Sequence, residues 1–126
     1  MLHVDILGRR TSFWGSSRDD PGAGRRGVRT VLVTIQYEVD PAKREAYLAH
    51  VREMRDHAVS ELHLDYRVFE DLEHANSFTE VFTCASVEDY ESLDDRQDDR
   101  FRELVARLDR YTDLDKVRYA AIAPLP

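Results

Sequence analysis

No glycine follows Gly27 in this 126-residue chain, although five glycines lie before residue 28. Glycine loosens a backbone and permits positive φ, so its abrupt loss marks the edge of a domain. The segment before that edge holds six arginines and three aspartates, and its part Ser16–Arg29 has little that could be buried. We therefore expect residues 1–29 to form a flexible or irregular basic arm and residues 30–126 to form one domain.

Cysteine and long apolar runs are also scarce. The single cysteine, Cys84, excludes an internal disulfide and a cysteine-rich metal site. No run approaches the roughly 18 apolar residues of a membrane span, and Asp5, Arg9 and Arg10 interrupt the place where a signal peptide needs its apolar core. We expect a cytoplasmic protein that does not enter a membrane.

Positive charge is scarce outside the arm. The chain has a net charge of −7, and without the arm's +3 the remainder carries −10. An acidic domain of this kind is a poor ligand for phosphate backbones. The segment Gly22–Gly27 fits G-x-G-x-x-G, but no strand precedes it and no helix follows it, so it lacks the context of a dinucleotide site. We expect no nucleic-acid partner, no cofactor and no bound metal.

The first half of the domain predicts a strand, a helix and a hairpin. Apolar and polar residues alternate from Val31 to Val39, as in a strand with one buried face. Asp40-Pro41 supplies an N-cap and a first-turn proline for a helix of about five turns. The hairpin strands are expected at 64–69 and 78–85, with a polar turn in which Asn76 tolerates positive φ.

The second half predicts an interrupted helix and a last strand. Ser86-Val87-Glu88-Asp89 has the form of a capping box. Residues 94–100 place like charges four positions apart, which disfavours a helix and predicts a break. An apolar helical stripe then runs from Phe101 to Tyr111, and a strand is expected over 116–123.

The order β-α-β-β-α-β predicts an α+β, ferredoxin-like fold, a four-stranded antiparallel sheet with both helices on one face. Apolar residues are expected on the open face as well, namely Leu32, Phe69, Val81 and Ile122. Because monomers rarely expose such a face, we expect a homodimer, the dimeric α/β barrel arrangement.

Several of these stretches together resemble the antibiotic biosynthesis monooxygenase (ABM) superfamily. They are Val31–Val39 with Asp40-Pro41, Arg67–Asp71 leading into Phe78–Phe82, and Ser86–Tyr90 before Phe101. The resemblance spans about residues 30–124 and implies a homodimeric α/β barrel with a pocket between sheet and helices. Members include cofactor-independent oxygenases of polyketide or quinol substrates, haem-degrading enzymes and proteins without known activity.

The haem-degrading branch relies on Asn, Trp and His at three places. The matching places here hold Thr34 or Gln36, Cys84 and Asp95, so the resemblance does not extend to haem degradation.

Two histidines and four aromatic residues are the candidate site residues. His50 and His57 flank the apolar stripe of the first helix, where either could shuttle a proton or could be a boundary histidine with one edge in water. Their spacing is wrong for a metal pair on a helix. A pocket for an aromatic ligand could be lined by residues that could equally be plain core: Tyr37, Tyr66, Phe82 and Tyr90.

Two functions follow. The first is a cofactor-independent, monooxygenase-like enzyme that binds a small aromatic or quinol substrate and deprotonates it for reaction with O₂. The second is a non-catalytic dimeric domain that binds a small ligand or a protein, since a fold does not determine a function. An enclosed pocket with convergent polar side chains would favour the enzyme, and a filled apolar gap would favour the binding domain.

Overall fold

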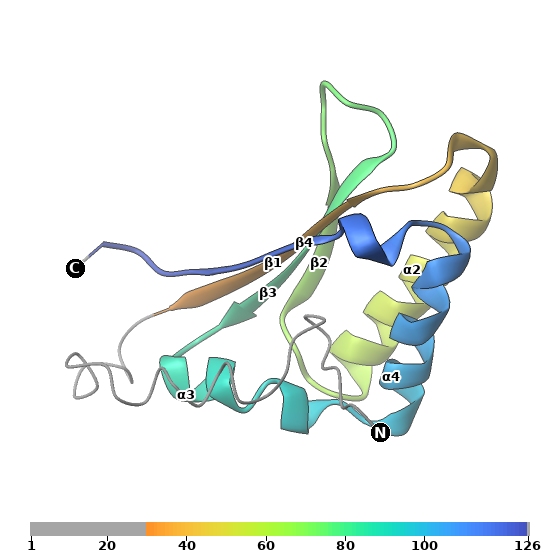
Figure 1. The fold of residues 1–126 in the computed structure, drawn as a ribbon. Coiled ribbons are helices and arrows are strands. Elements are labelled where there is room, and N and C mark those ends of the chain that lie inside the picture. Colours follow the sequence, from red (N-terminus) through yellow and green to blue (C-terminus); the bar gives the residue numbers. More distant parts are fainter. Residues whose placement is uncertain (1–29, 126) are drawn as a thin grey trace.

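Four antiparallel strands form one sheet in the order β2-β3-β1-β4, and the helices lie on one of its faces (Figure 1). The computed structural model describes residues 30–125, so the prediction of a basic arm over residues 1–29 lies outside the described residues. The strands are β1 (Val31–Glu38), β2 (Tyr66–Glu70), β3 (Ser77–Cys84) and β4 (Arg118–Ile122). This is the predicted ferredoxin-like α+β arrangement.

The first helix begins where the capping residues predicted it. Asp40 accepts a hydrogen bond from the Ala42 backbone nitrogen at 2.9 Å, and Pro41 opens the short 3-10 turn η3 (Pro41–Lys43). Helix α2 (Arg44–Ser60) continues from it along the sheet. No helix within residues 30–125 is long and apolar enough to cross a membrane.

The predicted break divides the second helical region. Helix α3 (Val87–Glu91) is capped by Ser86, whose Oγ accepts a hydrogen bond from the Asp89 backbone nitrogen at 3.1 Å. The 3-10 turn η4 (Asp94–Arg96) follows, and the chain is extended at Gln97 and Asp98. Helix α4 (Asp99–Ala106) then starts afresh beside α2 and runs into the 3-10 turn η5 (Arg107–Arg110) (Figure 1).

The last strand starts later than the sequence predicted. Residues Leu114–Lys116 form the 3-10 turn η6, because the Asp113 side chain accepts a hydrogen bond from the Asp115 backbone nitrogen at 3.0 Å. Strand β4 therefore begins at Arg118. Asn76 has φ 68° in the hairpin turn, as predicted, whereas the positive φ of His63 (55°) was not predicted.

Strand register sorts the side chains onto two faces. β1 pairs with β3 so that Val33 lies opposite Phe82 and Tyr37 lies opposite Phe78. These residues face the helices and form the core, which consists of Val31, Val33, Ile35, Tyr37, Val39, Tyr47, Val51, Met54, Ala58, Leu64, Tyr66, Phe78, Phe82, Cys84, Leu93, Phe101, Leu104 and Leu108.

The register places the four predicted outer-face residues on the side of the sheet away from the helices. Leu32 pairs with Ile122; Leu32 has the opposite parity to the buried residues of β1, and Ile122 has the opposite parity to Tyr119, the half-buried residue of β4. Phe69 is 49% exposed and Ile122 is 51% exposed, while Val81 is half-buried. The sheet thus has an outer face with apolar residues among polar ones.

Candidate functional site

A buried carboxyl group lies at the centre of the layer between sheet and helices. Glu80 on β3 has the same parity as Phe78 and Phe82, so its side chain faces the helices and is 1% exposed. Tyr37 donates its hydroxyl proton to Oε2 of Glu80 at 2.5 Å, and Tyr66 donates to Oε1 at 2.7 Å. The two oxygens of one carboxyl group therefore hold tyrosines from the two neighbouring strands.

A third tyrosine extends this cluster to the helix. The Tyr47 hydroxyl of α2 lies 2.7 Å from the Tyr37 hydroxyl. Because the Tyr37 proton is used toward Glu80, Tyr47 is the donor in this bond. We call Glu80, Tyr37, Tyr47 and Tyr66 the Glu80 cluster; its members are at most 4% exposed.

The Glu80 cluster has a definite proton count. With Glu80 ionised, three hydroxyl protons serve three hydrogen bonds and every donor has an acceptor. With Glu80 protonated, a fourth proton enters and one O–H group has no acceptor inside the cluster. The protonated cluster can therefore donate one hydrogen bond to a further group.

Burial is the main influence on the titration of this cluster. It raises the pKa of Glu80, while the hydrogen bonds from Tyr37 and Tyr66 oppose that rise. Burial, followed by the nearby Glu80 charge, also raises the pKa of Tyr37, Tyr47 and Tyr66. The phenols thus remain protonated, and the carboxyl group is the member that exchanges a proton.

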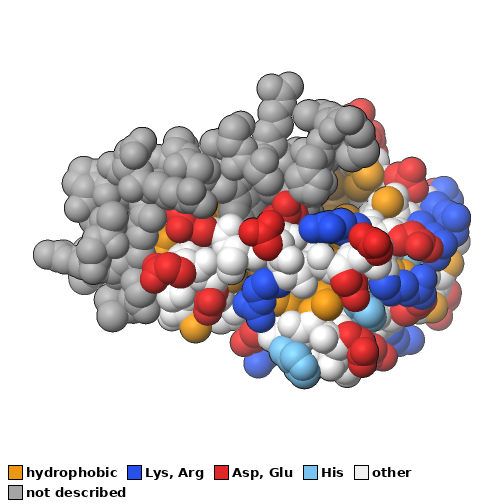
Figure 2. Space-filling view, turned by 90° about the horizontal axis from the view of Figure 1, so that it is seen from below, with side chains coloured by type: hydrophobic (Ala, Val, Ile, Leu, Met, Phe, Trp, Pro, Cys, Tyr) orange, Lys and Arg blue, Asp and Glu red, His pale blue; other side chains and the backbone are white. Residues whose placement is uncertain are grey.

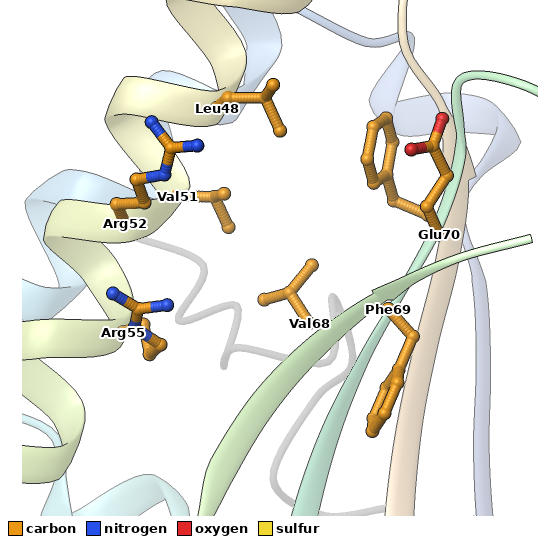
Figure 3. Close-up of a pocket in the computed structure, with 8 residues that line it drawn as sticks. Leu48, Val51, Arg52, Arg55, Val68, Phe69 and Glu70 are labelled. Atoms are coloured by element: carbon orange, nitrogen blue, oxygen red, sulfur yellow. The ribbon is translucent and has the colours of Figure 1, made fainter.

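A cavity of about 200 Å³ lies beside the cluster, between α2 and β2 (Figure 3). Leu48 and Val51 extend from the helix toward Val68 on the strand, and Arg52 and Arg55 extend from the same helix. The remaining lining residues are Phe69, Glu70 and Phe78. We call this space the α2–β2 cavity.

One layer of side chains separates the α2–β2 cavity from the Glu80 cluster. Val68 is the cross-strand partner of Glu80, and the Phe78 ring packs against Tyr47 with 4.5 Å between ring centroids. Both residues also line the cavity.

Glu70, which lines the cavity, is held in an ion pair. Arg44 donates to both carboxylate oxygens of Glu70, at 2.5 and 2.8 Å, and to the Asn76 side chain at 2.9 Å. The hydrogen bond from Arg44, with a second from the Asn76 backbone, lowers the pKa of Glu70 to about 2. Glu70 is thus held ionised by its partners and is a poor proton acceptor.

The predicted histidines hold the two long helices together. The Nε2 atom of His50 lies 2.7 Å from the Leu104 carbonyl oxygen, and the residue is 8% exposed. The Nε2 atom of His57 lies 2.8 and 2.9 Å from the two oxygens of Asp98, the N-cap of α4. Neither histidine lines the α2–β2 cavity.

The four predicted aromatic residues are divided between three places. Tyr37 and Tyr66 belong to the Glu80 cluster, and Phe82 lies behind it with its ring centroid 4.7 Å from that of Tyr66. Tyr90 lies half-buried in α3. Two of the four therefore converge on one polar group, and none lines the α2–β2 cavity.

Other reactive side chains have ordinary structural partners. Burial raises the pKa of Cys84 to about 11, which keeps its thiol protonated. Asp71 accepts hydrogen bonds from the backbone nitrogens of Glu73 and His74, so the acidic hairpin is a side-chain-stabilised turn. Residues 30–125 contain no group of three side chains suited to hold a metal ion.

No protein-family model matches this sequence, and no curated protein matches it. Solved structures of the same shape do match. A Caulobacter crescentus protein provisionally described as an antibiotic biosynthesis monooxygenase aligns with a TM-score of 0.64 at 11% identity, covering 82% of this chain and 96% of that one.

Two further structures agree with it. A Deinococcus radiodurans protein of the same provisional description aligns with a TM-score of 0.59 at 12% identity, covering 76% of this chain and 93% of that one. A Bacteroides thetaiotaomicron protein described as a possible oxidoreductase gives 0.58 at 13% identity, covering 77% and 99%. At these identities the likeness establishes the fold. The chain has the ABM fold, as its sequence resemblance predicted.

Proposed function

We propose that this protein is an oxygenase-like enzyme that binds a small phenol or quinol in the α2–β2 cavity and deprotonates it for reaction with O₂. The observation that carries the proposal is the Glu80 cluster beside that cavity. A carboxyl group whose pKa is raised by burial binds a proton more readily than an exposed one. The descriptions of two solved structures of this fold as antibiotic biosynthesis monooxygenases, one of them provisional, support an oxygenase assignment.

The three hydroxyl protons of the Glu80 cluster define a route by which a substrate hydroxyl can be deprotonated. A substrate hydroxyl next to Tyr47 passes its proton to that oxygen, the Tyr47 proton moves to Tyr37, and the Tyr37 proton moves to Glu80. The cluster then holds four protons, and its surplus O–H, now on Tyr47, donates to the substrate oxyanion. The electron-rich anion reacts with O₂, and the sequence contains no metal or flavin motif for another route.

Substrate access requires one side chain to move. Phe78 is 2% exposed and packs on Tyr47, so its ring covers the cluster on the cavity side. Rotation of this ring when substrate enters would place a substrate hydroxyl within reach of Tyr47. The closed state protects the buried carboxyl group from water.

Oxygen uptake with hydroquinones and anthrone-like phenols tests the proposal. Wild type should consume O₂, and Glu80→Gln should lose activity by about 100-fold or more, the usual contribution of a general base. Glu73→Gln is the matched control, because it makes the same charge change in the exposed hairpin turn. Absence of uptake by wild type, or full activity in Glu80→Gln, would refute the enzyme assignment.

A non-catalytic binding domain is the second candidate, and the tight packing of the Glu80 cluster favours it. Three hydrogen bonds link the four members in one chain, and all four are almost fully buried, as in a structural polar core. Phenol-induced amide shifts around α2 and β2 without oxygen consumption would identify this function.

We also propose that two chains form a homodimer through the outer sheet face. Phe69 and Ile122 are about half exposed there, and burying them would remove apolar surface from water. Light scattering should give twice the chain mass at micromolar concentration, and Phe69→Glu should shift it toward the monomer. A monomeric wild type would refute the dimer.

A further inference from the structure

The α2–β2 cavity carries positive charge in a domain that is otherwise acidic. Residues 31–126 contain 12 basic and 22 acidic side chains. Figure 2 shows charges of both signs mixed over the described part of one face. Against that background, Arg52 and Arg55 stand three positions apart on α2, so they lie on neighbouring parts of one helix face beside the cavity (Figure 3).

These two guanidinium groups are available to a ligand. Within residues 30–125, Arg52 has no ion pair. Arg55 meets only the adjacent Asp56, at 3.2 Å, with both side chains at least half exposed. An exposed pair of this kind is weak and is readily exchanged for another anion.

The other charges at the cavity cancel. Glu70 is held by both nitrogens of Arg44, so this pair contributes no net charge. The remaining walls are apolar, formed by the side chains of Leu48, Val51, Val68 and Phe78. The cavity thus combines an apolar interior with a cationic side formed by two arginines.

We propose that the α2–β2 cavity binds a single-ring aromatic carboxylate, with the ring between Val51 and Val68 and the carboxylate on Arg52 and Arg55. The proposal rests on the proposed function in taking this cavity as the substrate site, and it narrows the phenol to a phenolic acid. A volume of about 200 Å³ suits one ring, because it lies below the roughly 300–1,000 Å³ of sites for drug-sized ligands.

Arginine chemistry gives the selectivity. A guanidinium group presents a planar fork of N–H donors that matches the two oxygens of a carboxylate, whereas a neutral amide offers one acceptor oxygen and no negative charge. A pair of such groups at the mouth of an apolar cavity should therefore prefer an aromatic acid to an uncharged aromatic of the same shape.

Benzoate and benzamide are the matched probes, titrated into the full chain and followed by amide chemical shifts. We expect benzoate to bind at least tenfold more tightly than benzamide, with the largest shifts in α2 and β2. Arg52→Gln and Arg55→Gln should each weaken benzoate several-fold and leave benzamide unchanged. Arg110→Gln, an exposed charge that does not line the cavity, should change neither.

Salt provides an independent readout. Raising ionic strength from 0.05 to 0.5 M should weaken benzoate and not benzamide, since screening acts on the charge alone. Equal affinity for the two probes, binding of neither, or unchanged benzoate affinity in both arginine variants would overturn the proposal. Oxygen uptake from uncharged quinols is measured separately. Lack of uptake would refute the enzyme assignment and leave selective benzoate binding untouched, whereas lack of selective benzoate binding would refute this proposal and leave the quinol assay untouched.

Discussion

Removing the hydroxyl groups around Glu80 one at a time should destabilise the protein in a fixed order. Tyr37→Phe deletes a hydroxyl that takes part in two hydrogen bonds, one to Glu80 and one from Tyr47. Tyr66→Phe deletes one bond to the carboxyl group, and Tyr47→Phe deletes one bond between two phenols. Phenylalanine keeps the ring in each case, so the apolar packing is retained.

The expected losses follow from what each change leaves behind. Tyr37→Phe leaves Oε2 of Glu80 and the Tyr47 hydroxyl buried without a hydrogen-bond partner, which costs about 2–5 kcal/mol. Tyr66→Phe leaves Oε1 of Glu80 without a hydrogen-bond partner, which costs about 1–3 kcal/mol. Tyr47→Phe removes a terminal donor and leaves the Tyr37 bond to Glu80 in place, at about 0.5–1.5 kcal/mol.

Urea denaturation with linear extrapolation measures these free energies of unfolding, provided the slope m stays constant across the series. Tyr111→Phe is the control, because within residues 30–125 its hydroxyl makes no side-chain hydrogen bond, although its ring packs against that of Tyr47. We expect a change below about 0.5 kcal/mol for this control. Equal losses in all three cluster variants, or Tyr47→Phe as the most damaging, would refute the bonding pattern.

Three further predictions concern single residues. Burial raises the folded-state pKa of Glu80, so the protonated carboxyl group contributes its full stability below the ordinary carboxyl pKa, and this stability is lost as pH rises through the folded pKa. The free energy of unfolding should therefore decline in urea denaturation curves taken from pH 5 to 8, and Glu80→Gln should remove this decline. Asp98→Ala should lower the free energy of unfolding by about 1–2 kcal/mol, because it removes the oxygen that accepts from the Phe101 backbone nitrogen at the start of α4. Asp98→Asn should cost clearly less, because asparagine keeps a capping oxygen; equal losses in thermal melts would contradict the capping role. Cys84 should react with an aromatic disulfide reagent far more slowly in folded than in urea-unfolded protein at pH 8, because its folded pKa is about 11; equal rates by absorbance would contradict its burial.

The arrangement of elements was predictable because periodicity and capping are local. The alternation from Val31 and the Asp40-Pro41 cap placed β1 and the start of the first helix within a residue or two. The break before Asp98 was predictable because like charges four residues apart oppose a continuous helix. The turn over Leu114–Lys116 was not predicted, since a three-residue turn leaves no periodic pattern.

The site was predictable only in part. Tyr37 and Tyr66 were named as pocket candidates, but their common partner was missed, because a glutamate in a strand is ordinarily solvent-facing. The available signal was parity, since Glu80 stands midway between Phe78 and Phe82. Which tyrosines reach it depends on strand register, and the cavity depends on a gap between side chains of α2 and β2, neither of which is encoded locally.

The position of Glu80 also affects which strand pairing the chain can adopt. A slip of β3 by one residue would turn Glu80 outward and bring Val81 inward. Val81 is apolar and would be tolerated inside, so the hydrophobicity of this side chain distinguishes poorly between the native and the slipped register of β3. The slipped sheet would, however, leave Tyr37 and Tyr66 without their shared acceptor. The buried Glu80 thus helps to specify the strand register, because its hydrogen bonds form in the native pairing and are lost when β3 shifts by one residue.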